Sequence, residues 1–188
     1  MKNNSFYKKY FDLTHLIQNE FDRNIEKHGD KIKCSKGCSR CCSQIFRITS
    51  SDEFVIQKYL NELPENEKKF LKEKAEIYID LLSSEDSDKE DFFLKPILPC
   101  PALNDSGECT IYEARPVICR RFGPPLYNYK NPLKLFACEL NFEDGEEIID
   151  EELIPEQTKI GILWDELKTE FNSLSSKKNI ASTTIAEA

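Results

Sequence analysis

Eight cysteines carry the chemistry that this sequence can do, and four of them fall within nine residues. Three residues separate Cys34 from Cys38, two separate Cys38 from Cys41, and Cys42 follows directly. Cysteine thiolates are soft anionic donors that bind zinc and iron, and short spacers let neighbouring ligands surround one centre at a small entropic cost. This cluster therefore predicts a metal site.

The other four cysteines return at wide spacing later in the chain. Side chains of adjacent residues diverge, so the pair Cys41-Cys42 indicates a polynuclear cluster or two adjacent sites. Eight thiolates are enough for two four-thiolate sites, or for one cluster with spare cysteines, each of which could instead be a small buried hydrophobic residue. The predicted metal ligands are Cys34, Cys38, Cys41, Cys42, Cys100, Cys109, Cys119 and Cys138.

Composition narrows the class of protein. A hydrophobic fraction of 39% in 188 residues supports a modest core, so residues 1–188 are predicted to form a single domain. The formal charge of −8 argues against nucleic acid and anionic lipid as partners. We find neither a secretory signal nor an apolar run of about 20 residues, so we expect a cytoplasmic protein that does not enter the membrane. In a reducing compartment, cysteines favour metal over disulfides.

Helices must position most of the chain, so the predicted fold is mainly α. Apolar residues recur three or four apart in an N-terminal stretch, about 6–27, and a C-terminal stretch, about 155–174. Ser51 is a predicted N-cap for a helix that ends before Pro64, and a further helix is expected from about 64 or 65 to 82. The segment 45–49 fits either a strand or a helix end. Serine, threonine and alanine dominate after residue 174, which predicts a frayed tail.

The cysteine-cluster core is expected over about 34–138, and its second half is rich in proline. Prolines exclude long helices there, so we expect irregular backbone stapled by metal. The turn at 104–107 predicts a small hairpin that joins 102–103 to 109–112, at most a short β element. A short helix is expected to start at Arg115-Pro116. His28 closes the first helix, a role that we favour over metal ligation.

Several separated motifs together resemble one known family. They are Cys34-x3-Cys38-x2-Cys41-Cys42, then Cys100-Pro101-x-Leu103, then Cys109-x-Ile111-Tyr112-x2-Arg115-Pro116-x2-Cys119-Arg120-x-Phe122. This order is similar to the CxxCxxCC, or YkgJ-type, family of zinc- or iron-chelating cysteine-cluster domains, although the first spacer is three residues rather than two. The resemblance implies metal chelation between about 34 and 138. A similar cluster occurs in bacterial flagellin lysine N-methylases, which implies that the module can serve an enzyme.

The leading hypothesis is a cytosolic metal-binding protein whose thiolates hold zinc or an iron–sulfur cluster. The pair Cys41-Cys42 and the arginines at 115, 120 and 121 favour the iron–sulfur cluster slightly, because cationic groups offset the charge of an anionic centre. One alternative is a protein-modifying enzyme related to the flagellin methylases. Another is an interaction module in which metal only holds the fold together. Metal ions are therefore the predicted partners, with a protein substrate or partner in the alternatives.

Overall fold

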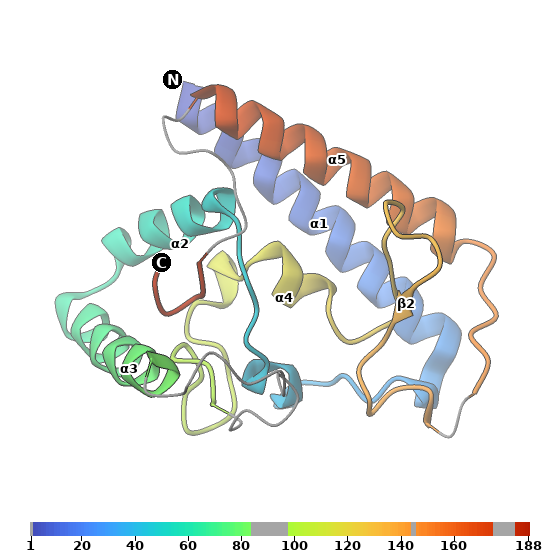
Figure 1. Ribbon diagram of the computed structural model, residues 1–188, viewed down its shortest axis with the longest axis horizontal. Coiled ribbons are helices and arrows are strands. Elements are labelled where there is room, and N and C mark those ends of the chain that lie inside the picture. The colour runs from blue at the N-terminus through green and yellow to red at the C-terminus, as the bar shows by residue number, and fades with distance from the viewer. Residues whose placement is uncertain (1, 84–97, 144–145, 175–182) are drawn as a thin grey trace. The chain divides into compact units, whose positions relative to one another are not determined.

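The computed structural model describes residues 2–83, 98–143, 146–174 and 183–188. The fold is mainly α with one short antiparallel sheet, as predicted (Figure 1). The chain divides into two compact units, which we describe separately. Unit 1 comprises Met1–Lys36 and Val117–Asn179, and unit 2 comprises Gly37–Pro116 and Ile180–Ala188. The organisation into a single domain stays a prediction.

Unit 1 is built on two long antiparallel helices, α1 (Lys2–His28) and α5 (Leu153–Leu174), which lie side by side (Figure 1). Both predicted terminal helices are confirmed, each a few residues longer than expected. The Phe6 and Phe171 rings lie 5.0 Å apart at one end of the pair. At the other end, Arg23 forms a 2.7 Å ion pair with Asp150, just before α5. The apolar stripes of the two helices bury each other, and this burial supplies the core of unit 1.

Shorter elements complete unit 1. The 3₁₀ turn η1 (Gly29–Lys31) follows α1, and α4 (Val117–Arg121) follows Pro116 at the place where a short helix was expected. The strands β1 (Leu126–Tyr127) and β2 (Leu135–Phe136) pair antiparallel.

Unit 2 contains α2 (Ser50–Glu62) and α3 (Glu65–Ser83), which confirm the two middle helices. The predicted N-cap of α2 was wrong by two residues. The Thr49 side chain accepts the N–H of Asp52 while Asp52 accepts the N–H of Thr49, which forms a capping box. The acid three residues after Thr49 places the cap there, whereas Ser51 lies inside the first turn and is fully buried.

The segments that join these helices carry little regular structure. A 3₁₀ helix, η2 (Arg40–Ser43), precedes the stretch 45–49, which proves to be neither strand nor helix end, because only Ile48 forms an isolated bridge. Its partner is Thr183. The frayed-tail prediction was therefore wrong for 183–188, where the Thr184 N–H also binds the Glu187 carboxylate at 2.7 Å. The rest of that tail, 175–182, lies outside the described residues.

The predicted hairpin at 102–112 forms only in reduced form, as one antiparallel bridge that closes the turn at 104–107. Leu103 pairs with Cys109 in an isolated bridge, and the 3₁₀ helix η4 (Tyr112–Ala114) follows. A hairpin with two paired residues in each strand forms at β1–β2.

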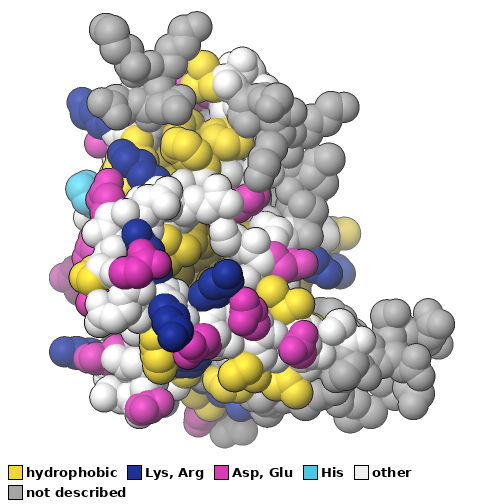
Figure 2. All heavy atoms as spheres, turned by 90° about the vertical axis from the view of Figure 1, so that its left-hand side faces the viewer, with side chains coloured by type: hydrophobic (Ala, Val, Ile, Leu, Met, Phe, Trp, Pro, Cys, Tyr) yellow, Lys and Arg dark blue, Asp and Glu magenta, His cyan; other side chains and the backbone are white. Residues whose placement is uncertain are grey.

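The face of unit 2 that carries α2 and α3 is hollowed, and apolar side chains line the hollow between charged ones (Figure 2). The cavity measures about 290 Å³, and Leu60, Leu71, Ile111 and Ile185 form part of its wall. Each helix in the described residues is too short or too polar to cross a lipid bilayer.

Candidate metal centre

All eight cysteines are free thiols, and they are divided between the two units. Cys138 is buried, Cys38 is exposed, and the others are half-buried. Unit 1 holds Cys34, Cys119 and Cys138, and unit 2 holds Cys38, Cys41, Cys42, Cys100 and Cys109. Reduced thiols are the form in which cysteine can bind a metal.

The vicinal pair of unit 2 lies in the tight turn η2, whose backbone is held by the Cys42 N–H donating to Ser39 O at 2.9 Å. A hydrogen bond between the two side chains joins Cys41 to Cys42, and together with burial it raises the pKa of the Cys41 thiol. The positive charge of Arg115 acts in the opposite direction. The adjacent side chains, expected to diverge, therefore meet in this turn.

Cys100 joins this pair through the backbone, because its N–H donates to Cys42 O at 2.7 Å. Burial, together with the nearby thiols of Cys109 and Cys41, raises the pKa of the Cys100 thiol to about 11. The positive charge of Lys74 lowers it. Cys41, Cys42, Cys100 and Cys109 thus share one neighbourhood, and we call them the unit 2 thiol group.

The turn that begins at Asn104 helps to bring this neighbourhood together. Asn104 Oδ1 accepts the N–H groups of Ser106, at 3.0 Å, and Glu108, at 2.8 Å, which curls the chain just before Cys109. Gly107 has a φ of +76°, and a Cβ there would lie 3.2 Å from Gly37 O. Glycine at this position lets the turn approach the backbone between the first two motif cysteines.

The thiols of unit 1 have a different setting. Asn141 Nδ2 donates to Cys34 Sγ at 3.5 Å and to Gly123 O at 2.6 Å. The Cys138 N–H also donates to Gly123 O, at 2.9 Å. Gly123 and Asn141 therefore link the segments that carry Cys34 and Cys138, while Cys119 lies in α4.

In the part of the chain that the structure describes, the thiols lie near one another but do not form a complete metal-binding site. There, no group of three or more cysteine, histidine, aspartate or glutamate side chains is arranged to hold a metal ion. The donor set nevertheless fits zinc or iron in kind, because free thiolates are the ligands that both metals take in structural and cluster sites. Binding at the unit 2 thiol group would require these side chains to turn toward one ion and release their protons.

One of the three motif arginines, Arg115, acts on a thiol whose pKa is shifted. Arg115 affects Cys41, and its guanidinium lies 5.0 Å from the Tyr112 ring centroid. Arg121 instead donates to Gln157 Oε1 at 2.9 Å and to Tyr127 O at 3.3 Å, and burial lowers its pKa to about 10. Arg120 lines a small cavity of unit 1 together with Arg121.

His28 has the structural setting that we expected. It is the last residue of α1, and its ring lies 5.0 Å from the Phe142 ring. Burial lowers its pKa, against the opposing charge of Asp150.

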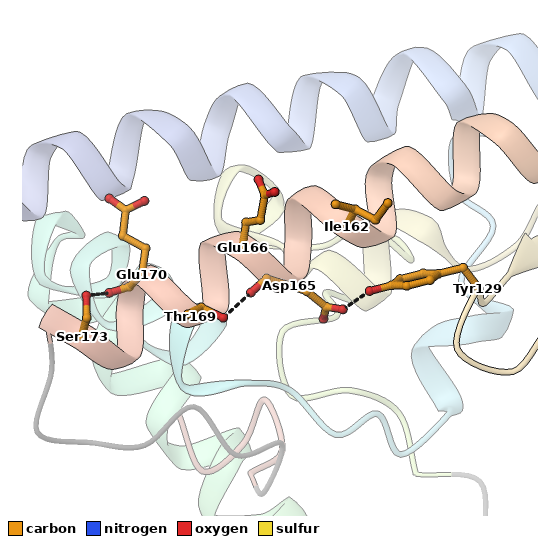
Figure 3. A pocket seen from close by; sticks show the side chains of 7 residues that line it. All are labelled: Tyr129, Ile162, Asp165, Glu166, Thr169, Glu170 and Ser173. Carbon is orange, nitrogen blue, oxygen red and sulfur yellow. Dashed lines mark hydrogen bonds between the residues drawn. The ribbon is translucent and has the colours of Figure 1, made fainter.

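A pocket along α5 contains a polar cluster that the sequence did not reveal (Figure 3). The Tyr129 hydroxyl donates to Asp165, whose carboxylate also pairs with Lys130 at 2.5 Å and Lys168 at 2.7 Å. Although burial opposes ionisation, these cations and the hydroxyl hold the pKa of Asp165 below its usual range. A carboxylate occupied in this way suits the docking of the Tyr129 loop better than proton transfer.

One residue in the sequence hinted at this cluster. A Cβ at Gly161 would lie 2.8 Å from Tyr129 Cδ1, so glycine in the middle of α5 leaves room for the ring. An isolated glycine in a helical pattern costs stability and therefore calls for such a packing reason.

Residues 33–134, more than half of the chain, match a family described as "CxxCxxCC: Putative zinc- or iron-chelating domain". The chain belongs to the CxxCxxCC family. No curated protein and no solved structure matches the chain. The CxxCxxCC match confirms the resemblance seen in the motifs, and it supports chelation of zinc or iron. It contains seven of the eight cysteines, whereas Cys138 and Asn141 lie beyond its end.

Proposed function

We propose that this protein is a cytosolic zinc- or iron-binding protein in which Cys41, Cys42, Cys100 and Cys109 form one thiolate centre. The observation that carries the proposal is that the backbone of unit 2 brings these four residues together. Cys41 and Cys42 share the turn η2, the Cys100 N–H donates to Cys42 O at 2.7 Å, and the chain after Cys100 turns back through the bridge between Leu103 and Cys109. Four thiolates complete the ligand set of a zinc ion or of an iron–sulfur cluster.

The remaining cysteines, Cys34, Cys38, Cys119 and Cys138, are proposed as further ligands. Three of them lie within the CxxCxxCC match, and Cys34 already accepts a hydrogen bond from a buried amide. Hydrogen-bond donors to sulfur are typical of the surroundings of thiolate ligands.

Of the two kinds of centre, we propose an iron–sulfur cluster ahead of a zinc site. The two adjacent thiols are held together in η2, and the charges of Arg115 and Lys74 act on the thiol group. Nearby cations offset the negative charge of a polynuclear thiolate centre, which supports this choice. Neither alternative, the protein-modifying enzyme or the interaction module, gains an observation from this geometry.

Metal analysis with a visible spectrum of anaerobically purified protein tests the proposal. An iron–sulfur cluster should give a brown protein that contains iron and acid-labile sulfide. A colourless protein with stoichiometric zinc would overturn the iron assignment and keep the chelator. Protein that takes up neither metal, even after reconstitution, would overturn the function itself.

Variants test the assignment of the unit 2 thiol group. Cys100→Ser should lower the metal content or affinity strongly, because it removes one of four ligands. Ser43→Ala, next to Cys42 in η2, is the control and should keep wild-type metal binding. Full metal binding by Cys100→Ser would remove Cys100 from the centre.

A further inference from the structure

Asn141 is a buried residue of unit 1 that forms hydrogen bonds with two of its cysteines, Cys34 and Cys138. It is only 4% exposed, and it lies seven residues beyond the end of the CxxCxxCC match. Its backbone N–H donates to Cys138 O at 2.8 Å, which places it in the turn that follows that cysteine. Its position in the fold is therefore set by one cysteine while its side chain reaches another.

The orientation of the amide is defined by its partners. The Lys33 N–H donates to Asn141 Oδ1 at 2.8 Å, so this atom must be the carbonyl oxygen. The opposite atom faces Gly123 O at 2.6 Å, an acceptor that requires an N–H donor. It follows that an N–H group, and not an oxygen, lies 3.5 Å from Cys34 Sγ.

The space around the Cys34 sulfur is also restricted. Gly123 has a φ of +126°, and a Cβ there would lie 2.7 Å from Cys34 Sγ. The sulfur is thus packed against a bare backbone on one side and meets the Asn141 amide on another. A side chain with few positions open to it loses little conformational freedom on binding a ligand.

We infer that Asn141 is a positioning residue for Cys34 as a metal ligand. Its N–H donates to the sulfur and stabilises the negative charge of the thiolate, while its other bonds tie the Lys33, Gly123 and Cys138 segments together. The inference rests on the proposed function and adds a residue to it that lies outside the matched region. Removal of a hydrogen-bonding partner of a metal ligand weakens binding about ten- to a hundred-fold.

The test measures the affinity of reconstituted full-length protein for Co²⁺ and Zn²⁺ by competition with a chromophoric chelator. Asn141→Asp keeps the acceptor for Lys33 and loses the donors, so metal binding should weaken about ten- to a hundred-fold. Asn141→Ala removes both functions without adding a buried charge, and it should weaken binding in the same direction. Asn131→Asp makes the same chemical change at an exposed site and should bind as wild type does.

Two further readouts separate this role from general loss of structure. In a Cys34→Ser background, Asn141→Asp should weaken metal binding little further, because its effect passes through that sulfur. The thiolate-to-cobalt absorption of Asn141→Ala should also shift, whereas that of Asn131→Asp should match wild type.

Metal affinities within twofold of wild type in both variants would overturn the role of Asn141. Equal weakening with and without the Cys34 sulfur would overturn it as well. If wild-type protein binds no metal, the proposed function fails and this role fails with it. A wild-type protein that binds metal beside variants that bind equally well rejects the role of Asn141 alone.

Discussion

At the scale of single residues, the thiols depend on neighbours that are distant in sequence. Cys34 and Asn141 are 107 positions apart and meet within hydrogen-bonding distance. The cysteine motif predicts which atoms bind metal, but spacing says nothing about what surrounds them. Asn141 could not have been predicted, because a single asparagine three residues after Cys138 forms no recognisable motif.

Substitution of Gly123 tests this local control. We expect Gly123→Ala to lower the free energy of unfolding by about 1–3 kcal/mol, because its φ of +126° strains any residue with a Cβ. It should also weaken metal binding, since the new methyl would displace Cys34 Sγ. Urea unfolding and metal titration measure the two effects.

Gly29→Ala is the matched control for that variant. Gly29 also has a positive φ, +54°, but nothing lies within 4 Å of a Cβ there. It should therefore lose stability and keep its metal affinity. If the two variants bind metal equally well, the close approach of position 123 to the Cys34 sulfur does not affect metal binding.

At the scale of elements, ion pairs join α1 to the segment that precedes α5. The buried side chain of Asp150 pairs with Arg23 at 2.7 Å and with Lys27 at 3.1 Å. Burial opposes its ionisation, but the hydrogen bonds from Arg23 and Lys27 outweigh it and lower the pKa of Asp150 to about 2. A carboxylate with a lowered pKa stabilises the fold only while it is ionised.

The sign of the resulting pH dependence follows from this shift. The unfolded pKa is near 3.8, so the stabilisation is complete well above pH 4 and disappears as the pH falls toward 2. Asp150→Asn should lower the free energy of unfolding at pH 7 on the order of 1 kcal/mol, because solvent screens part of the attraction. The loss should shrink in acid. Unfolding curves between pH 2 and 7 measure it.

Asp12→Asn on the exposed side of α1 is the control for this pH profile. It should change stability little at any pH. An Asp150→Asn profile that runs parallel to wild type down to pH 2 would contradict the role of this carboxylate.

Regular elements were easier to predict than the irregular ones. Long apolar stripes define α1, α3 and α5, because helical periodicity repeats over several turns. The strands β1 and β2 are two residues each, too short for alternation to show. The cap of α2 was misplaced because Thr49 and Ser51 both suit an N-cap, and only the pairing with Asp52 decides between them.

At the scale of the whole molecule, metal should matter unequally to the two units. The helix pair of unit 1 has its own apolar core, whereas the backbone at 98–112 of unit 2 is held by isolated turns. Removal of metal by a chelator should therefore reduce amide protection most at 98–112, while α1 and α5 stay protected. Hydrogen exchange followed by mass spectrometry measures this difference.

Addition of zinc or iron after chelation is the control, and it should restore the protection. Equal loss of protection in α1 and α5 would show that metal holds the helix pair too. The composition of the metal-binding segment predicted this dependence, since prolines leave it few regular hydrogen bonds. The split of the cysteines between two units was not predictable, because linear spacing does not show which thiols fold together.

Unit 1 is discontinuous in sequence, and this has a consequence for biosynthesis. The ribosome releases α1 first, then all of residues 37–116, and only later α5, which covers the apolar stripe of α1. During that interval the apolar stripe of α1 lacks its partner helix, and most of the cysteines have already been synthesised. Factors that guard newly made protein, or that deliver metal to it, thus have a window that closes when the last long helix emerges.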